Sequence, residues 1–244
     1  MENIAKKCYN LKKNLYLCGG NKNTHDMAYA SLSSDIVQST TLSVADLKRL
    51  HDYILLFLNH ISHYHGSNLW GRLVKGDEVE IVTDRPNDIL RVALLFKCYL
   101  KSFEPSEKTG ADFRRYGARI AIGIGDLRIN DSNNGLVDGE AIYCSGRALS
   151  SLSEAKKSGQ TLILSSANAA SDDALNAMLA LVDALFNKMT RKQCIIIFHK
   201  LKGRNEKDIA QRLKISQPTV NKSVNSVSWT ALSKALDYFE KYNF

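Results

Sequence analysis

Two carboxylates stand at positions where predicted strands end. Asp35 closes the first predicted strand, and Asp77 lies in the turn of a predicted hairpin with the sequence Lys75-Gly76-Asp77-Glu78. If these elements are neighbours in an antiparallel sheet, the carboxylates meet at one edge. That arrangement suits a hard cation such as Mg²⁺, with phosphate oxygens completing the coordination. The structural alternative is that Asp35 caps a turn and Asp77 suits a tight hairpin, as Asp often does.

A second group of residues, from 208 to 222, has the pattern of a helix-turn-helix. Ile209, Ala210 and Leu213 fall on one helical face, and Ala210 is small enough for a second helix to approach closely. Ser216 stands where a helix N-cap is needed, and Pro218 falls in the first turn, where its missing N–H has no cost. The spacing therefore predicts two helices joined by a short turn.

The second of these helices has an apolar side and a polar side. Val220, Val224 and Val227 continue an apolar stripe, which leaves outside it polar side chains that can hydrogen-bond base edges or phosphates. Together with the cap residue, the predicted DNA contacts are Ser216, Gln217, Thr219, Asn221, Lys222 and Asn225. The alternative is an ordinary helical hairpin inside a core.

The balance of charge favours double-stranded DNA as a partner. From residue 188 to 244, 12 Lys and Arg stand against 4 Asp and Glu, so this segment carries the whole excess of +8. Counterion release from a phosphate backbone requires positive charge concentrated in this way. A solvated basic face is the alternative, but it gives no reason for the excess to lie at one end.

The remaining periodicities predict the elements that position these residues. Strands are predicted at residues 28–34, 68–74, 79–83, 116–125 and 161–164, and helices at 43–65, 88–103, 139–157 and 167–186. Ser43 and Asn87 are the predicted N-caps of the first two helices. The order indicates an α+β fold, one mostly antiparallel sheet with helices on a face, followed by an all-α segment with further helices at 191–202 and 229–242.

Four short motifs, in order, resemble class III adenylate and guanylate cyclases. The run Asp35-Ile36-x-x-Ser39-Thr40 is similar to the first metal motif of that family, and Gly76-Asp77 is similar to the second. The strand at 119–125 resembles the central strand of the family, and residues 139–147 resemble the segment that ends in its transition-state arginine. The likeness spans residues 28–165. The Gly-Asp-Glu hairpin also resembles diguanylate cyclases, which share a palm-like core.

The resemblance implies a ferredoxin-like, palm-type sheet that binds a nucleotide. Asp35 and Asp77 would be the metal ligands, with Mg²⁺ or Mn²⁺ and a nucleoside triphosphate as cofactors. Arg147 would be the catalytic arginine. The residues at the nucleotide would be Lys75, Tyr143 and Arg147.

Two positions depart from the family pattern. Tyr143 stands where the family has an asparagine, four residues before Arg147. Leu73 stands at the position of the purine-recognising lysine, while Lys75 is adjacent to the hairpin glycine. These departures favour a domain that keeps a metal–triphosphate site and has lost cyclisation, with Arg147 still able to clamp a phosphate.

A closer resemblance is to the small SatD-type bacterial proteins, which join such a domain to a C-terminal helix-turn-helix. It predicts an N-terminal appendage at 1–26, a nucleotidyl cyclase-like domain at 27–187 and a DNA-binding domain at 188–244. The expected function is a homodimeric transcription regulator whose cyclase-like domain senses a nucleotide or dimerises the chain. Two alternatives remain open: an active two-metal nucleotidyl cyclase with an appended DNA-binding module, and a dimerisation domain without a ligand.

Cysteine usage and hydropathy indicate the cytoplasm. The five cysteines are odd in number and none forms a pair at metal-ligand spacing, which favours a reducing compartment. No apolar run approaches the ~20 residues that a membrane helix needs. The first 20 residues also lack the uninterrupted apolar core of a signal peptide. We therefore expect no membrane partner.

Overall fold

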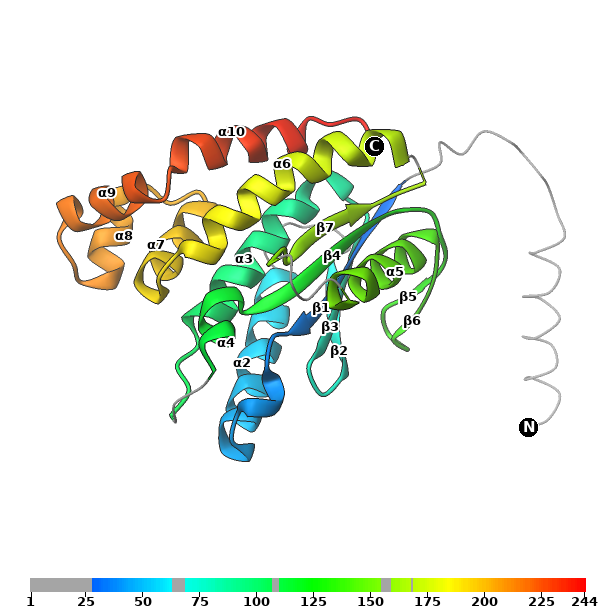
Figure 1. Cartoon of the computed structure of the whole chain (residues 1–244), viewed down its shortest axis with the longest axis horizontal. Coiled ribbons are helices and arrows are strands. Elements are labelled where there is room, and N and C mark those ends of the chain that lie inside the picture. Colours follow the sequence, from blue (N-terminus) through cyan, green and yellow to red (C-terminus); the bar gives the residue numbers. More distant parts are fainter. Residues whose placement is uncertain (1–27, 63–68, 107–109, 155–158, 168) are drawn as a thin grey trace, which may run out of the picture.

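The computed structural model describes residues 28–62, 69–106, 110–154, 159–167 and 169–244. Within these ranges the chain forms a five-stranded sheet, a separate two-stranded sheet and helices around them (Figure 1). The predicted α+β class is confirmed. The predicted appendage at 1–26 lies outside the described residues.

The large sheet has the strand order β2-β3-β1-β4-β7. Neighbouring strands are antiparallel except for β4 and β7, which are parallel, so the prediction of a mostly antiparallel sheet is confirmed. The central strand β1 lies between the hairpin β2–β3 and β4. The five strands are β1 (Tyr29–Ile36), β2 (Trp70–Lys75), β3 (Glu78–Thr83), β4 (Ala118–Gly125) and β7 (Leu162–Ser165).

The helix α5 (Glu140–Glu154) packs on one face of the sheet, against small side chains. On β1, Ser33 Oγ lies 2.9 Å from Ser145 Oγ of the helix, which also donates a hydrogen bond of 3.2 Å to Ser31. On β4, a Cβ at Gly123 would lie 2.0 Å from the carbonyl oxygen of Ala141. The helix can therefore approach this closely only because the sheet presents serine and glycine to it.

The opposite face of the sheet carries the hydrophobic core. Leu32 and Ile122 alternate with the residues that face α5 and are fully buried. Phe57 and Phe96 meet in this core, with ring centroids 5.2 Å apart. The helices that supply the core are α2 (Val44–Ser62), α3 (Ile89–Ser102), α4 (Ala111–Tyr116) and α6 (Ala169–Lys188).

Four C-terminal helices extend the same core: α7 (Arg191–Leu201), α8 (Glu206–Leu213), α9 (Gln217–Ser226) and α10 (Trp229–Glu240). Arg91 of α3 links two of these helices, α7 and α10, to the sheet region. It forms an ion pair of 2.6 Å with Glu240 and donates a hydrogen bond of 2.9 Å to the carbonyl of Leu201. The helices α8 and α9 project at the end of the molecule away from the sheets (Figure 1).

The structure differs from the sequence predictions in three respects. Asn87 is not a helix cap, because Pro86–Asp88 form a 3-10 turn and the Asn87 amide donates a hydrogen bond of 2.7 Å to the carbonyl of Tyr242. Helices cover both faces of the sheet rather than one. The sequence pattern also misses α4, which is short, and the hairpin of β5 (Leu127–Asp131) and β6 (Leu136–Gly139), whose residues are largely exposed and give little apolar alternation.

Candidate functional site

Asp35 lies beside two other charged residues at the end of β1. Its partners in the strand register are Glu78 on β3 and Arg119 on β4, so the three side chains share one face of the sheet. The Arg119 guanidinium forms an ion pair with the Asp35 carboxylate. Sequence reasoning does not single out Glu78 or Arg119, since only the register of the strands brings them to Asp35.

Asp77 lies in the β2–β3 turn, next to the end of β1. Its carbonyl accepts a hydrogen bond of 3.3 Å from the Ile36 N–H, and its carboxylate accepts one of 2.5 Å from the Ser39 hydroxyl. Burial raises the pKa of Asp35, the Arg119 charge opposes that rise, and the negative charge of Asp77 adds to it. The structure therefore brings Asp35 and Asp77 together at one edge of the sheet.

Asp35 and Asp77 suit a cation that takes the rest of its coordination from a bound phosphate and water. In the described ranges, no group of three or more His, Cys, Asp or Glu residues is arranged to hold a metal ion. Mg²⁺ at nucleotide sites is bound by one or two carboxylates and takes its other oxygen ligands from phosphates and water. Asp35 and Asp77 fit that requirement, and the Arg119 ion pair competes with a cation for Asp35.

Of the three residues predicted at the nucleotide, Lys75 lies in the same hairpin as Asp77, whereas Tyr143 and Arg147 lie elsewhere. Lys75 ends β2, and its side chain is outside the described part of the structure. Tyr143 and Arg147 lie one turn apart on the exposed side of α5, away from the sheet. The Arg147 guanidinium donates a hydrogen bond of 3.2 Å to the Tyr143 carbonyl, and its described contacts include neither of the two carboxylates.

The hairpin β5–β6 holds the ring of Tyr143. The Tyr143 hydroxyl donates to the carboxylate of Asp138 and accepts a hydrogen bond of 3.0 Å from Arg128. Arg128 also forms an ion pair with Asp138. Hydrogen bonds from Tyr143 and Arg128 lower the pKa of Asp138. This three-residue cluster depends on a hairpin that the sequence pattern does not predict.

The helices α8 and α9 are joined by a short turn, as the sequence spacing predicts. Asn205 caps α8 by accepting a hydrogen bond of 2.9 Å from a backbone N–H in its first turn. Lys214 ends the helix in the left-handed conformation, with φ 53°, and so redirects the chain. Ser216 caps α9 by accepting a hydrogen bond of 3.3 Å from the Thr219 N–H, and Pro218 lies in the first turn. Both predicted features of this helix start are confirmed.

The helix α9 is buried on one side and exposed on the other. Val220, Val224 and Val227 are at most 5% exposed. Asn225 donates a hydrogen bond of 3.0 Å to Asn221, which donates one of 3.2 Å to Glu206 of α8. The predicted division of the helix is confirmed, because all the predicted outer side chains are exposed: Gln217, Thr219, Asn221, Lys222 and Asn225.

Positive charge gathers where α7 meets α8. Burial, followed by the charges of Arg204, Arg212 and Lys202, lowers the pKa of His199 to about 4. Among the described residues, His199 Nδ1 and Arg204 Nε are buried without a hydrogen-bond partner. An anion such as a phosphate would offset this concentration of charge.

Comparison of the sequence with protein-family models finds no match, and comparison with curated proteins finds none either. In the described ranges, no helix combines the length and apolar character needed to cross a membrane.

Proposed function

We propose that this protein is a DNA-binding transcription regulator in which α9 enters the major groove of double-stranded DNA. The observation behind this proposal is that the valine side of α9 is buried while its opposite, polar side is exposed. Asn and Gln can pair with adenine edges, and Lys222 can contact a guanine or a phosphate. Arg204 and Arg212 support it, since helix-turn-helix proteins also grip the phosphate backbone with residues that flank the reading helix.

We also propose that the sheet region is a nucleotidyl cyclase-like domain with a ferredoxin-like, palm-type fold. Asp35 and Asp77 would hold Mg²⁺ or Mn²⁺ with a nucleoside triphosphate, and their adjacency supports this role. Lys75, Tyr143 and Arg147 would meet the nucleotide. Because Tyr143 and Arg147 lie on the exposed side of α5, a homodimer can present them to the carboxylates of a second copy.

A two-fold dimer would also suit the DNA. Two copies of α9 about one helical turn of DNA apart would read a palindromic site. The described cysteines Cys98, Cys144 and Cys194 are free thiols, which supports our placement of the protein in the cytoplasm.

Selection from random-sequence duplexes with the full chain tests the DNA-binding role. We expect one enriched motif, and we expect Gln217→Ala and Asn221→Ala to lose preference at particular base pairs, costing ~1–3 kcal/mol at the selected site. Asn133→Ala, an exposed amide near the β5–β6 turn, is the matched control and should retain the motif. Enrichment of no motif, or equal loss in all three variants, contradicts the proposed reading helix.

A thermal shift tests the nucleotide site separately. With Mg²⁺ and a nucleoside triphosphate at a hundredfold excess over the dissociation constant, the full chain should gain about 2.7 kcal/mol of stability. Asp77→Asn should abolish the gain, while Asp52→Asn, an exposed carboxylate on α2, should keep it. The absence of a shift with every nucleotide contradicts this half of the proposal.

The adjacent carboxylates also favour a second candidate, an active nucleotidyl cyclase. Cyclisation joins the ribose 3′-oxygen to the α-phosphate and releases pyrophosphate, so Arg147 would have to offset charge at the phosphate. The described contacts instead bind Tyr143 to Asp138 and Arg128. We therefore expect slow turnover or none, and steady production of a cyclic nucleotide that is lost in Asp77→Asn would establish the enzyme.

A further inference from the structure

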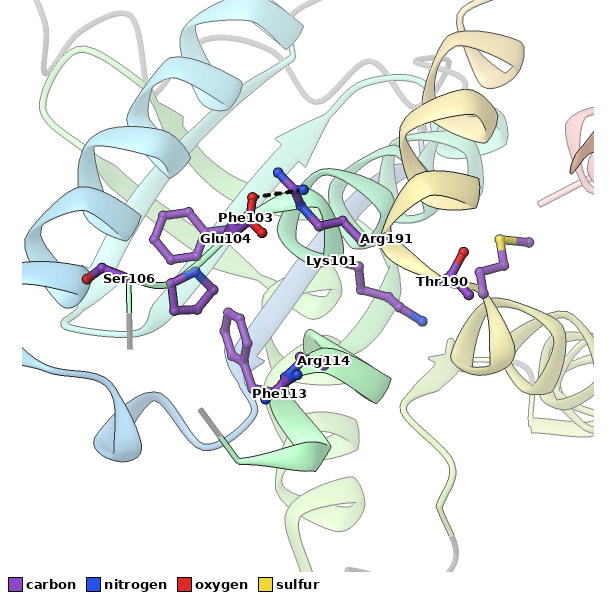
Figure 2. Close-up of a pocket in the computed structure, with 10 residues that line it drawn as sticks. Lys101, Phe103, Glu104, Ser106, Phe113, Arg114, Thr190 and Arg191 are labelled. Carbon is purple, nitrogen blue, oxygen red and sulfur yellow. Dashed lines mark ion pairs between the residues drawn. The ribbon is translucent and has the colours of Figure 1, made fainter. Parts of the chain in front are cut away.

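A cavity of about 480 Å³ lies where the sheet region meets the first C-terminal helix. Residues at the end of α3, on α4 and at the α6–α7 junction line it, as Figure 2 shows. Its volume falls within the range of small-molecule sites. The lining side chains that matter here are Lys101, Phe103, Phe113, Arg114, Thr190 and Arg191.

The lining carries more positive than negative charge. Three of the lining side chains are basic, Lys101, Arg114 and Arg191, and one is acidic, Glu104. Arg191 pairs with Glu104 at 2.9 Å and donates a hydrogen bond of 2.8 Å to a backbone carbonyl at the end of α3, which fixes the guanidinium in place. Lys101 is held by a hydrogen bond of 2.5 Å to the Phe186 carbonyl. Burial lowers the pKa of Lys101 to about 8, so the amine is still mostly protonated at pH 7.

One wall of the cavity is aromatic. Phe103 and Phe113 lie edge to face, with ring centroids 6.4 Å apart, and both are largely buried. In the view of Figure 2, both rings lie on one side of the cavity, with Lys101 and Thr190 on the other. An aromatic surface next to fixed cations selects for a ligand that has both an aromatic ring and an anionic group.

We propose that this cavity binds a small aromatic carboxylate. Its ring lies against Phe103 and Phe113, and its carboxylate accepts charge-assisted hydrogen bonds from the Arg114 and Arg191 guanidinium groups. Because Glu104 and a backbone carbonyl take Nη1 and Nε of Arg191, its contact with the ligand is made through Nη2.

The position of the cavity also allows a bound ligand to affect the placement of the helix-turn-helix. Thr190 caps α7 and Arg191 is its first residue, while the end of α7 leads to His199 and then to α8. A ligand that contacts both α4 and the start of α7 will favour one placement of the C-terminal helices over others. This effector role rests on the proposed DNA binding, whereas the binding site itself does not.

Calorimetric titration of the full chain with 2-naphthoate tests the site. Two matched probes separate the parts of the ligand: cyclohexanecarboxylate lacks an aromatic ring, and 2-naphthalenemethanol lacks the charge. We expect 2-naphthoate to bind about tenfold more tightly than either. Equal affinity for all three probes, or no binding of 2-naphthoate, overturns the proposal.

Two arginines on α4 provide a matched pair of variants. Arg114→Gln should weaken 2-naphthoate binding by about tenfold, since one charge-assisted contact is lost. Arg115→Gln should leave it unchanged, because the Arg115 guanidinium lies over the Tyr116 ring and is not among the lining residues. Equal weakening in both variants indicates unspecific charge attraction and overturns the site.

Phe113→Leu then tests the aromatic wall. It should remove the preference for 2-naphthoate over cyclohexanecarboxylate, and circular dichroism checks that the variant is folded. Because Phe113 is 1% exposed, Phe103→Leu serves as a second test if the first variant unfolds. Retention of the full preference in a folded variant overturns the assignment of the ring site.

The effect on DNA is measured with a labelled duplex. 2-Naphthoate should change the DNA affinity of the wild-type chain, and Arg114→Gln should need about tenfold more 2-naphthoate for the same change. If 2-naphthoate binds but DNA affinity stays the same, the effector role is wrong. If the chain binds no DNA, the proposed function fails, and calorimetry still decides whether the cavity binds the carboxylate.

Discussion

Arg119 and Asp35 form an ion pair across the β1–β4 ladder, at the carboxylate that we propose binds a divalent cation. Their side chains are 21% and 25% exposed, so solvent screens the pair only in part. A cation at Asp35 therefore has to displace a positive charge. We predict that Arg119→Gln binds Mn²⁺ about tenfold more tightly than the wild type, in a titration without nucleotide.

Charge and size can be separated at this position. Arg119→Lys keeps the cation and should bind Mn²⁺ with close to wild-type affinity. The double variant Arg119→Gln with Asp77→Asn should lose the gain in Mn²⁺ affinity. Unchanged Mn²⁺ affinity in Arg119→Gln would show that Asp35 is not a ligand.

The stability of the core should depend on Asp183. Lys97 and Asp183 form an ion pair of 2.8 Å, with side chains 0% and 2% exposed, and the Thr161 N–H donates a hydrogen bond of 2.6 Å to the same carboxylate. Burial lowers the pKa of Lys97, and Asp183 opposes that effect. We predict that Asp183→Ala lowers the free energy of unfolding by about 3–5 kcal/mol, because it leaves a buried ammonium unpaired.

Denaturation in urea measures this loss. The double variant Lys97→Met with Asp183→Leu removes both charges and should recover much of the stability. If Asp183→Ala and the double variant are equally unstable, the loss comes from the Thr161 hydrogen bonds or from packing rather than from the unpaired charge.

Local signals explain which parts of this molecule are predictable from the sequence. Ser216 and Pro218 mark the start of α9 because a cap and a first-turn proline act within a few residues. Likewise, the glycine-containing turn after Lys75 marks the β2–β3 hairpin. The described boundaries of the long helices and strands lie within a few residues of those predicted, because their apolar periodicity is strong. The predicted helix ends at 65 and 157 and the predicted strand start at 68 lie outside the described residues.

The rest of the candidate site depends on tertiary register. Asp35 and Arg119 are separated by 84 positions, and a shift of one residue between β1 and β4 would place the arginine on the other face. The hairpin that holds Tyr143 has short, largely exposed strands, so no apolar alternation in the sequence predicts it. Asn87 resembles a cap in sequence, but its amide meets Tyr242, which no local pattern can show.

Two glycines should respond to alanine in opposite ways. At Gly123 a Cβ would lie 2.0 Å from the Ala141 carbonyl oxygen and 2.5 Å from the Ser145 nitrogen, so α5 would have to move. At Gly146 a Cβ would meet nothing within 4 Å. We predict that Gly123→Ala destabilises the protein by about 1–3 kcal/mol, whereas Gly146→Ala, in an exposed helix interior, stabilises it by about 0.5–1 kcal/mol. Thermal unfolding compares the two directly, and a stable Gly123→Ala would show that α5 lies farther from the sheet.

The stability of the C-terminal helices should fall in mild acid because of His199. Its pKa is lowered to about 4 by burial and by Arg204, Arg212 and Lys202, against 6.5 for the free side chain. Below pH 6.5 the unfolded chain takes up a proton that the folded chain does not bind, so stability is lost as the pH falls toward 4. Since the side chain is partly exposed, we expect the wild type to lose about 1 kcal/mol more than His199→Gln between pH 7 and 5. Urea denaturation at each pH measures the difference, and parallel losses in both proteins would assign the effect to carboxylates instead.

The salt dependence of DNA binding should distinguish two lysines of the same basic segment. Lys222 lies on the exposed side of α9, and Lys234 is exposed on α10. If Lys222 contacts a phosphate, it releases about one counterion on binding, and Lys222→Ala should reduce the slope of log affinity against log salt by about 1. Lys234→Ala removes the same charge from the same segment and should leave the slope unchanged, because α10 does not belong to the reading surface. Fluorescence anisotropy over a range of salt concentrations gives both slopes with the full chain. Equal reductions in the two variants would mean that the whole basic segment attracts DNA without a preferred orientation, and α9 would lose its assignment as the reading helix.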